Sequence, residues 1–264
     1  MLIWHKRDGS ELPALPCRKN IAHLECTGKR TMRERELEFD RKKHMLYSKS
    51  AKKVIQAHLR ARYPPEEAEQ YWTATQKTYV EILELIPYMG GKQNKQAGSV
   101  YDCAALFAFY KAVPEKPDLE EFEHMNEELF LPPFHRAKLF DLNRPILAKA
   151  ARWIWTTLAK CSAAHSTDWP GNYHMEMRPC PEGTKYVFLR CPIAELAKKL
   201  GYTSLMPAMC NPDYPMLRCM HAGLIRRTTC ANGDCCDFWI VGDRSHFLKE
   251  HPCRKSEDGY LYNE

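Results

Sequence analysis

The feature that most constrains the fold of this chain is a change of sequence pattern at His165. Before His165, apolar residues recur at helical spacing between charged residues, as in the highly charged segment 31–62. A Pro64-Pro65 pair starts a further helical stretch that continues to about residue 86. After His165, short β-type segments alternate with turn residues; they cover residues 173–177, 185–191, 222–229 and 237–241. This order predicts an α+β fold, with a helical N-terminal half packed on a mostly antiparallel C-terminal β-sheet.

The same patterns predict one hydrolase-sized domain over residues 31–243, helical from 31 to 164 and strand-rich from 165 to 243. A chain of 264 residues is long enough to bury a sizeable core. We expect residues 1–30, which show no clear period, to form a loosely packed arm. The polar residues 244–264 are expected to form a peripheral tail. Core positions are assigned to three apolar side chains of the last predicted helix, Trp153, Trp155 and Leu158.

Composition limits the possible partners. The net charge is +6, from 39 basic and 33 acidic residues, and the two signs are interleaved. This balance does not indicate nucleic-acid binding. No apolar run is long enough for a signal peptide or a membrane span, so we expect a cytoplasmic protein with no membrane partner. A homo-oligomer remains open. In a reducing compartment the 12 cysteines would be free thiols, most of them buried packing residues.

The stretch 226–241, RRTTCANGDCCDFWIV, concentrates unusual chemistry. An Asn232-Gly233-Asp234 turn between β-prone flanks (225–229 and 238–241) predicts a β-hairpin. Its loop side carries Cys230, Cys235 and Cys236, and Asp237 follows directly. No C-x-x-C pair occurs in the chain, which argues against a thioredoxin-type or standard zinc site. These thiols could still bind a metal together with Cys210, act as a nucleophile, or only pack.

A cysteine nucleophile needs a neighbouring group that lowers its pKa. Asp237 would raise the pKa of a thiol beside it, so a cation or an imidazole must come from elsewhere. The candidates are Arg226, Arg227, His165, His174 and His221, although a histidine taken singly is more often an ordinary surface or core residue.

Two further segments carry groups that could reach a shared site. Cys210 and Asp213 repeat the association of a thiol with a nearby carboxylate, and paired carboxylates suit a planar, positively charged amidine. The Gly90-Gly91 pair, followed by Lys92 and Asn94, would let the backbone approach a ligand closely. The same pair is also a common turn between helices, and it lacks the spacing of a phosphate-binding loop.

Several of these segments together resemble one enzyme family. They are Cys191 before a short predicted helix, Cys210 with Asp213, the Arg/Thr stretch 226–229, the Cys236-Asp237-Phe238 run, and the segment 86–94. Over about residues 71–243 the chain resembles the L-2-amino-thiazoline-4-carboxylic acid hydrolase family. The resemblance leaves open whether Arg226 or Arg227 takes the place of the family's arginine.

The resemblance implies a hydrolase that acts on carbon–nitrogen bonds other than peptide bonds, in a small cyclic amidine of the thiazoline type. In the mechanism that we expect, Cys236 attacks the amidine carbon and Asp237 or Asp213 holds the amidinium and moves a proton. His165 or His174 would activate the thiol. The substrate would be bound by Gly90, Gly91, Lys92, Asn94 and one of the two arginines, Arg226 or Arg227.

This expectation assigns no metal ligand and no cofactor, although a divalent metal is possible. Two other functions remain open: a metal-assisted hydrolase with Cys, Asp and His ligands, and a non-catalytic thiol module that binds a small molecule or a metal. In the plainest alternative, the cysteines only pack.

Overall fold

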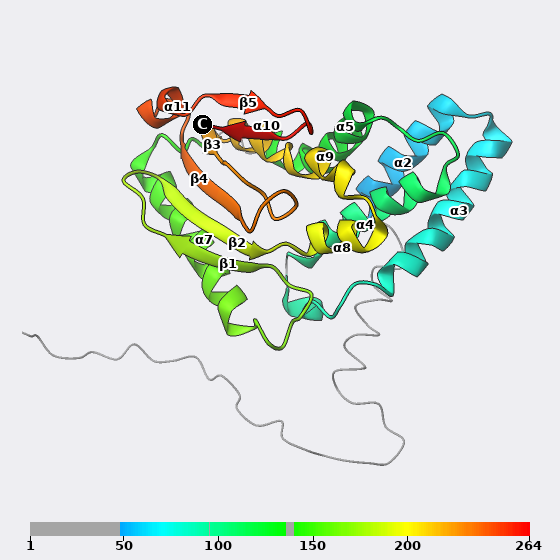
Figure 1. Ribbon diagram of the computed structural model, residues 1–264, viewed down its shortest axis with the longest axis horizontal. Coiled ribbons are helices and arrows are strands. Elements are labelled where there is room, and N and C mark those ends of the chain that lie inside the picture. Colours follow the sequence, from blue (N-terminus) through cyan, green and yellow to red (C-terminus); the bar gives the residue numbers. More distant parts are fainter. Residues whose placement is uncertain (1–47, 95, 136–139) are drawn as a thin grey trace, which may run out of the picture.

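A computed structural model describes residues 48–94, 96–135 and 140–264, without the side chain of Lys92. The predicted arm (1–30) and the first part of the predicted helical segment lie outside the described residues. The described chain has a helical part at one side and an antiparallel sheet at the other, which confirms the predicted α+β class (Figure 1). None of the helices in these residues is long and apolar enough to cross a membrane.

The helical part is built around α4. Its elements are α2 (Lys49–Arg62), α3 (Pro65–Leu83), the 3-10 helix η1 (Gly91–Gln93), α4 (Ala97–Ala112), α5 (Leu119–Phe130) and the one-turn α6 (Pro132–His135). Helix α4 is apolar nearly all round and is buried from Val100 to Phe109 except at Asp102. A helix of that kind belongs at the centre of a helical layer. The amphipathic helices α2, α3 and α5 pack around it.

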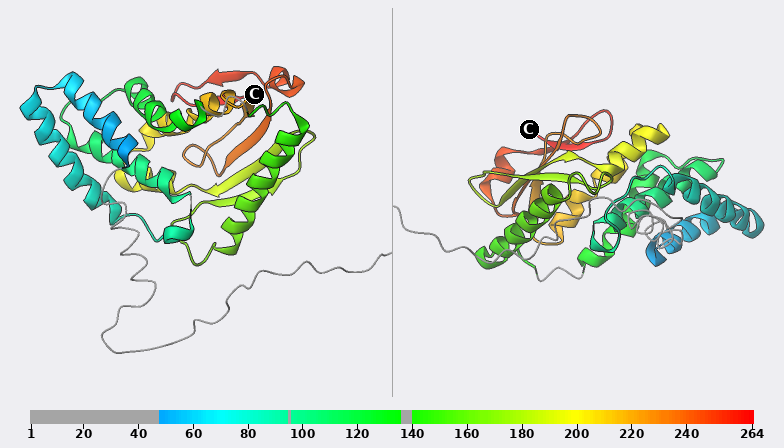
Figure 2. Two further views of the ribbon diagram at one scale, coloured as in Figure 1. Left: turned by 180° about the vertical axis from the view of Figure 1, so that it is seen from behind. Right: turned by 90° about the horizontal axis from the view of Figure 1, so that it is seen from below.

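The sheet lies in the C-terminal half. Its strands are β1 (His174–Arg178), β2 (Thr184–Arg190), β3 (Ala222–Ile225) and β4 (Cys236–Gly242), in the order β1-β2-β4-β3, with every neighbouring pair antiparallel. Helix α7 (Pro145–Ala164) packs against β1 and β2, so it belongs to the sheet side of the molecule although it precedes the change of pattern at His165 (Figure 2).

The assignment of Trp153 to the core is wrong. Its side chain is 70% exposed, whereas Trp155 stacks on Tyr186 of β2 at a ring distance of 4.7 Å. Two positions apart on a helix point about 200° away from each other, so only one of the two tryptophans can face the sheet. Leu158 packs against the sheet cluster as expected.

The segment between β2 and β3 joins the two sides. It forms α8 (Pro192–Leu200), the 3-10 helix η3 (Thr203–Leu205), α9 (Met206–Cys210) and α10 (Asp213–Arg218). Helices α8 and α9 contribute to the hydrophobic cluster of the helical part, and α10 contributes to the cluster under the sheet. Cys230 packs against both clusters, so the boundary between them passes through the predicted cysteine hairpin.

The hairpin is confirmed, but its first strand is shorter than predicted and its second strand is longer. Strand β3 pairs with β4 up to Ile225 opposite Trp239, and residues 226–235 form the connection. The backbone leaves the ladder because side chains take over its hydrogen bonds. Asn232 Oδ1 accepts hydrogen bonds from the backbone N–H and the hydroxyl of Thr229, at 2.8 and 2.9 Å. The connection is therefore fixed by local side-chain contacts.

The predicted tail is structured, and it is exposed or partly exposed over most of its length but buried near residues 259–263. The tail forms α11 (His246–Glu250) and a small sheet of β5 (Cys253–Lys255) and β6 (Leu261–Asn263). Asn263 is 3% exposed. Its Oδ1 accepts hydrogen bonds from the backbone N–H of Arg226 and from the hydroxyl of Tyr214, at 3.0 and 2.9 Å, and its Nδ2 donates to the carbonyl of His251. The tail thus closes over the connection between β3 and β4.

Replacing Asn263 by Ala should lower the free energy of unfolding by roughly 2–4 kcal/mol, because the change leaves buried donors without partners. Glu264→Ala is the matched control, since this neighbouring side chain is exposed and forms only an exposed pair with Arg254. Urea unfolding measures both variants. Equal stability of the two would show that the tail is peripheral after all.

Candidate active site

Four thiols gather at the boundary between the helical part and the sheet. This thiol cluster consists of Cys191 before α8, Cys210 at the end of α9, Cys230 in the connection and Cys236 at the start of β4. Desolvation is the main reason that each thiol has a raised pKa, and each also has its pKa raised by at least one other member. The cysteines of the predicted hairpin therefore do meet a cysteine of the preceding segment.

A buried ion pair lies beside the thiol cluster. Arg226 Nη1 donates to Asp213 Oδ2 at 2.8 Å, and Arg226 Nη2 donates to the carbonyl of Cys210 at 3.1 Å. The side chain of Arg226 is 1% exposed and that of Asp213 is 23% exposed. The guanidinium lies between the rings of Tyr214 and Phe238, with Cζ 5.1 and 5.6 Å from their centroids. Asp213 is therefore the member of the pair that meets solvent.

The pKa values of the two groups in this buried ion pair differ from those in a surface salt bridge. Burial raises the pKa of the Asp213 carboxyl to about 6, although Arg226 acts in the opposite direction. Burial also lowers the pKa of Arg226, but Asp213 and the neighbouring thiols raise it more, so the guanidinium stays charged. A carboxyl that titrates near neutral pH can give and take protons under ordinary conditions.

The three thiols that match the family pattern differ in their surroundings. Burial raises the pKa of Cys236 well above its ordinary value, and Arg226 opposes that rise. Desolvation raises the pKa of Cys210 to about 12, and Arg226 again opposes it. Desolvation likewise raises the pKa of Cys191 to about 12, although hydrogen bonds from the backbone N–H groups of Ala194 and Ile193 lower it. All three are neutral thiols at rest.

Asp237 does not face the cluster. Its Oδ1 accepts hydrogen bonds from the backbone N–H groups of Arg227 and Thr228, both at 2.9 Å. Side chains alternate along a strand, so Cys236 and Phe238 point into the buried face of β4 while Asp237 points to the other face. The carboxylate therefore holds the connection in place, and Asp213 is the carboxylate that lies with the thiols.

The two histidines expected to activate the thiol contact other residues. His165 ends α7 and stacks on Trp169 with ring centroids 3.8 Å apart. His174 begins β1, is partly exposed, and lies 3.8 Å from Glu176. Among the described residues, none of their recorded contacts is with Cys236 or Cys210.

The Gly90-Gly91 segment forms a separate junction. A side chain at Gly90, where φ is +100°, would collide with the ring of Trp169. Asn94 is buried, and its Nδ2 donates to Met89 O at 2.6 Å and to Asn172 Oδ1 at 2.9 Å. The backbone of Lys92 lies in η1, and its side chain lies outside the described part. The glycines thus allow close packing between the end of α3 and the loop before β1.

One tyrosine, Tyr173, connects this junction with the thiols. Tyr173 follows Asn172 directly, and its hydroxyl lies 3.1 Å from Ser99 Oγ at the start of α4. Burial raises the pKa of Tyr173, and Cys191 and Cys103 raise it further, so the ring lies close to these thiols. Sequence reasoning missed Tyr173 as a site residue because its position in a predicted strand indicates only packing.

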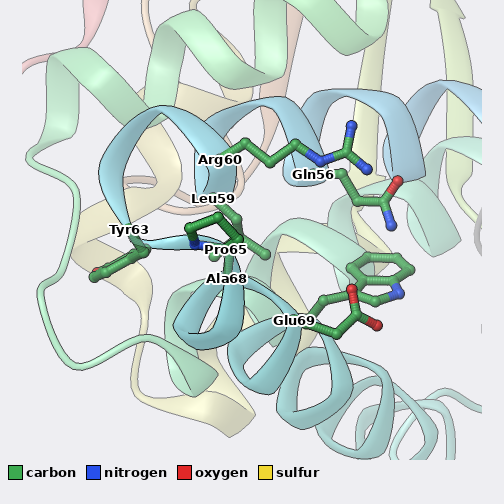
Figure 3. A pocket seen from close by; sticks show the side chains of 8 residues that line it. Gln56, Leu59, Arg60, Tyr63, Pro65, Ala68 and Glu69 are labelled. Carbon is green, nitrogen blue, oxygen red and sulfur yellow. The ribbon is translucent and has the colours of Figure 1, made fainter.

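The two hollows recorded in the described part lie away from the thiol cluster. The larger, about 450 Å³, lies between α2 and α3, with Leu59, Tyr63 and Trp72 among its lining residues (Figure 3). The smaller, about 20 Å³, lies between α7 and the end of β4. Within residues 48–94, 96–135 and 140–264, no three His, Cys, Asp or Glu side chains are arranged to hold a metal ion.

A family of known proteins matches more than half of the chain. Residues 99–240 match the L-2-amino-thiazoline-4-carboxylic acid hydrolase family. The chain belongs to this family. The membership supports a hydrolase of this type. No curated protein and no solved structure matches the chain.

The matched part contains the whole of the thiol cluster and the ion pair. The Gly90-Gly91 segment and the tail that carries Asn263 lie outside it. Of the two candidate arginines, Arg226 is buried against Asp213, while Arg227 is exposed.

Arg226→Ala should lower the free energy of unfolding by roughly 3–5 kcal/mol, because it leaves the Asp213 carboxylate desolvated and without its cation. Arg227→Ala is the matched control and should change stability by less than about 0.5 kcal/mol, since Arg227 is exposed. Urea unfolding at pH 7.5 checks both. A similar small loss in each variant would contradict the structural role of the pair.

Proposed function

We propose that this hydrolase opens a C–N bond of a small cyclic amidine of the thiazoline type, with Cys236 as the nucleophile and Asp213 as the proton carrier. The observation that supports this most is the position of Asp213, a carboxyl with a pKa of about 6 beside Cys236 and Cys210. This arrangement of thiol and carboxyl combines the two groups that hydrolysis of an amidine needs, a nucleophile and an acid–base group.

Asp213 suits the binding of the amidinium. Its Oδ2 is occupied by Arg226, and its side chain is partly exposed, so the carboxylate has further acceptor capacity towards an incoming ligand. A planar amidinium can donate two N–H groups to a carboxylate. The positive charge of the substrate would also favour the thiolate form of a nearby cysteine.

The reaction then follows with its atoms balanced. The Sγ of Cys236 bonds to the amidine carbon as its proton passes to Asp213, and the C=N π electrons move to nitrogen. Asp213 returns the proton to the ring nitrogen as the ring C–N bond breaks. Water adds to the same carbon, and one of its protons passes through Asp213 to Sγ as the C–Sγ bond breaks. The other proton ends on the released amine as the carbamoyl C=O forms. The product is a ring-opened carbamoyl compound, and the thiol is restored.

The other expected site residues take smaller parts in this proposal. Asp237 keeps the connection in place, as its hydrogen bonds to Arg227 and Thr228 require. A role for Lys92 or Asn94 in binding the substrate carboxylate remains a proposal, as does activation by His165 or His174. Cys210 stands as the second nucleophile to be tested.

Cys236→Ser should lower kcat for hydrolysis of L-2-amino-thiazoline-4-carboxylate by on the order of 10³, because a serine hydroxyl without an activating base is a poor nucleophile. Cys210→Ser is measured in parallel, and Cys161→Ser, at an exposed position on α7, is the control. Unchanged turnover by Cys236→Ser, together with lost turnover by Cys210→Ser, would move the nucleophile to Cys210.

The acid limb of the pH profile should report Asp213. The carboxyl must be ionised to accept the thiol proton, so kcat/KM should rise with pH through about 6, the pKa to which burial raises this group. In Asp213→Asn the activity should fall by at least about 10²-fold and that limb should vanish. A limb of the same midpoint in Asp213→Asn would assign it to another group.

A further inference from the structure

The proposed nucleophile lacks an evident activating group. Its sequence neighbour Asp237 faces the other side of β4 and would in any case disfavour a thiolate. Neither His165 nor His174 contacts it in the recorded interactions of the described residues. Yet the pKa of Cys236 is raised by burial, so a thiolate would need a nearby positive charge.

Arg226 is the cation that shares the buried face with Cys236. The last ladder pair of β3 and β4 joins Ile225 to Trp239. Continuing that register places Arg226 opposite Phe238, and the guanidinium indeed lies over the Phe238 ring. Cys236 is two residues from Phe238 on the same face, a diagonal position that a long side chain can reach.

One donor of the guanidinium is unused. Nη1 donates to Asp213 and Nη2 to the Cys210 carbonyl, whereas Nε is buried and has no hydrogen-bond partner among the described residues. The whole residue is 0% exposed, so water does not easily serve this donor. A buried N–H without a partner costs about 1–3 kcal/mol, so one can be expected to gain a partner in the working state.

The ion pair also solves a problem of charge. Moving a proton from Cys236 to Asp213 exchanges one anion for another beside the same guanidinium. Before transfer, Arg226 faces a carboxylate; after transfer, it faces a thiolate and a neutral carboxyl. The buried site holds one positive and one negative charge in both states, so no isolated charge is created in a desolvated place.

We infer that Arg226 is a positioning residue that holds the Cys236 thiolate through its free Nε–H while Asp213 holds the proton. This inference rests on the proposed function in naming Cys236 as the nucleophile and Asp213 as the proton carrier. It differs from the sequence-based expectation, in which an arginine pairs with the substrate carboxylate and a histidine activates the thiol. The raised pKa of Arg226, to which Cys236 contributes after Asp213, is consistent with that proximity.

The test is the pH dependence of Cys236 alkylation by iodoacetamide, measured without substrate by peptide mass spectrometry. The parent is Asp213→Asn, which removes the competing anion, and Arg226→Met is added to it so that no unpaired carboxylate is left. The added change should slow alkylation of Cys236 at pH 8 by about tenfold or more and move the midpoint upwards, because a lost cation of this kind is worth about one pKa unit. Cys161, exposed on α7, is the internal control in the same digest.

Arg226→Lys in the same Asp213→Asn parent keeps the charge and guards against misfolding of the Met variant. It should restore most of the alkylation rate, since the ammonium remains near the thiol, while a purely structural role would not distinguish Lys from Met in this way. The inference is overturned if Asp213→Asn and the double variant with Arg226→Met show the same pH dependence of Cys236 alkylation.

Hydrolysis by Cys236→Ser separates the two proposals. If Cys236→Ser loses turnover and the alkylation profile of Cys236 does not depend on Arg226, the proposed function is kept and the role of Arg226 is rejected. If Cys236→Ser keeps full turnover and the alkylation profile of Cys236 depends on Arg226, Cys236 is rejected as the nucleophile and the contact between Arg226 and the thiolate is kept.

Discussion

The guanidinium of Arg226 is the interaction on which the site depends. A desolvated charge is tolerated only when its surroundings supply an opposite charge and hydrogen-bond acceptors. Asp213 supplies the charge from α10, the carbonyl of Cys210 supplies an acceptor from α9, and Tyr214 and Phe238 enclose the group from two sides. Three separate parts of the sequence, which are 210–214, Arg226 and Phe238, must therefore meet before the charge is acceptable. The same requirement places two thiols beside a carboxyl that titrates near neutral pH.

Features with a local cause could be predicted from the sequence. Helical periodicity and proline starts gave the helical half, and the Asn-Gly turn between β-prone flanks gave the pairing of β3 with β4. The association of Cys210 and Asp213 with the hairpin also has a local cause, because only the short helix α10 separates Cys210 from β3 in the sequence. The family membership was carried by the same segments.

Features that depend on distant contacts could not be predicted. The choice of Arg226 over Arg227 is made by which of the two adjacent side chains points into the core. The sequence did contain a signal for Asp237: strand alternation puts it on the face opposite Cys236 and Phe238, and adjacency in the sequence was mistaken for proximity of the side chains. Asn263 gave no signal, because a polar residue in a polar tail indicates exposure until its partners are known.

The closure by Asn263 has a consequence for the order of assembly during synthesis. Asp213 and Arg226 are 13 residues apart and can meet while the chain is still being made, whereas Asn263 lies 37 residues beyond Arg226. A nascent chain would thus carry the ion pair before the backbone of Arg226 has its last acceptor. A chain without residue 263 would leave the hydroxyl of Tyr214 and the backbone N–H of Arg226 without this acceptor. The surroundings of the ion pair therefore become complete only once strand β6 has been made.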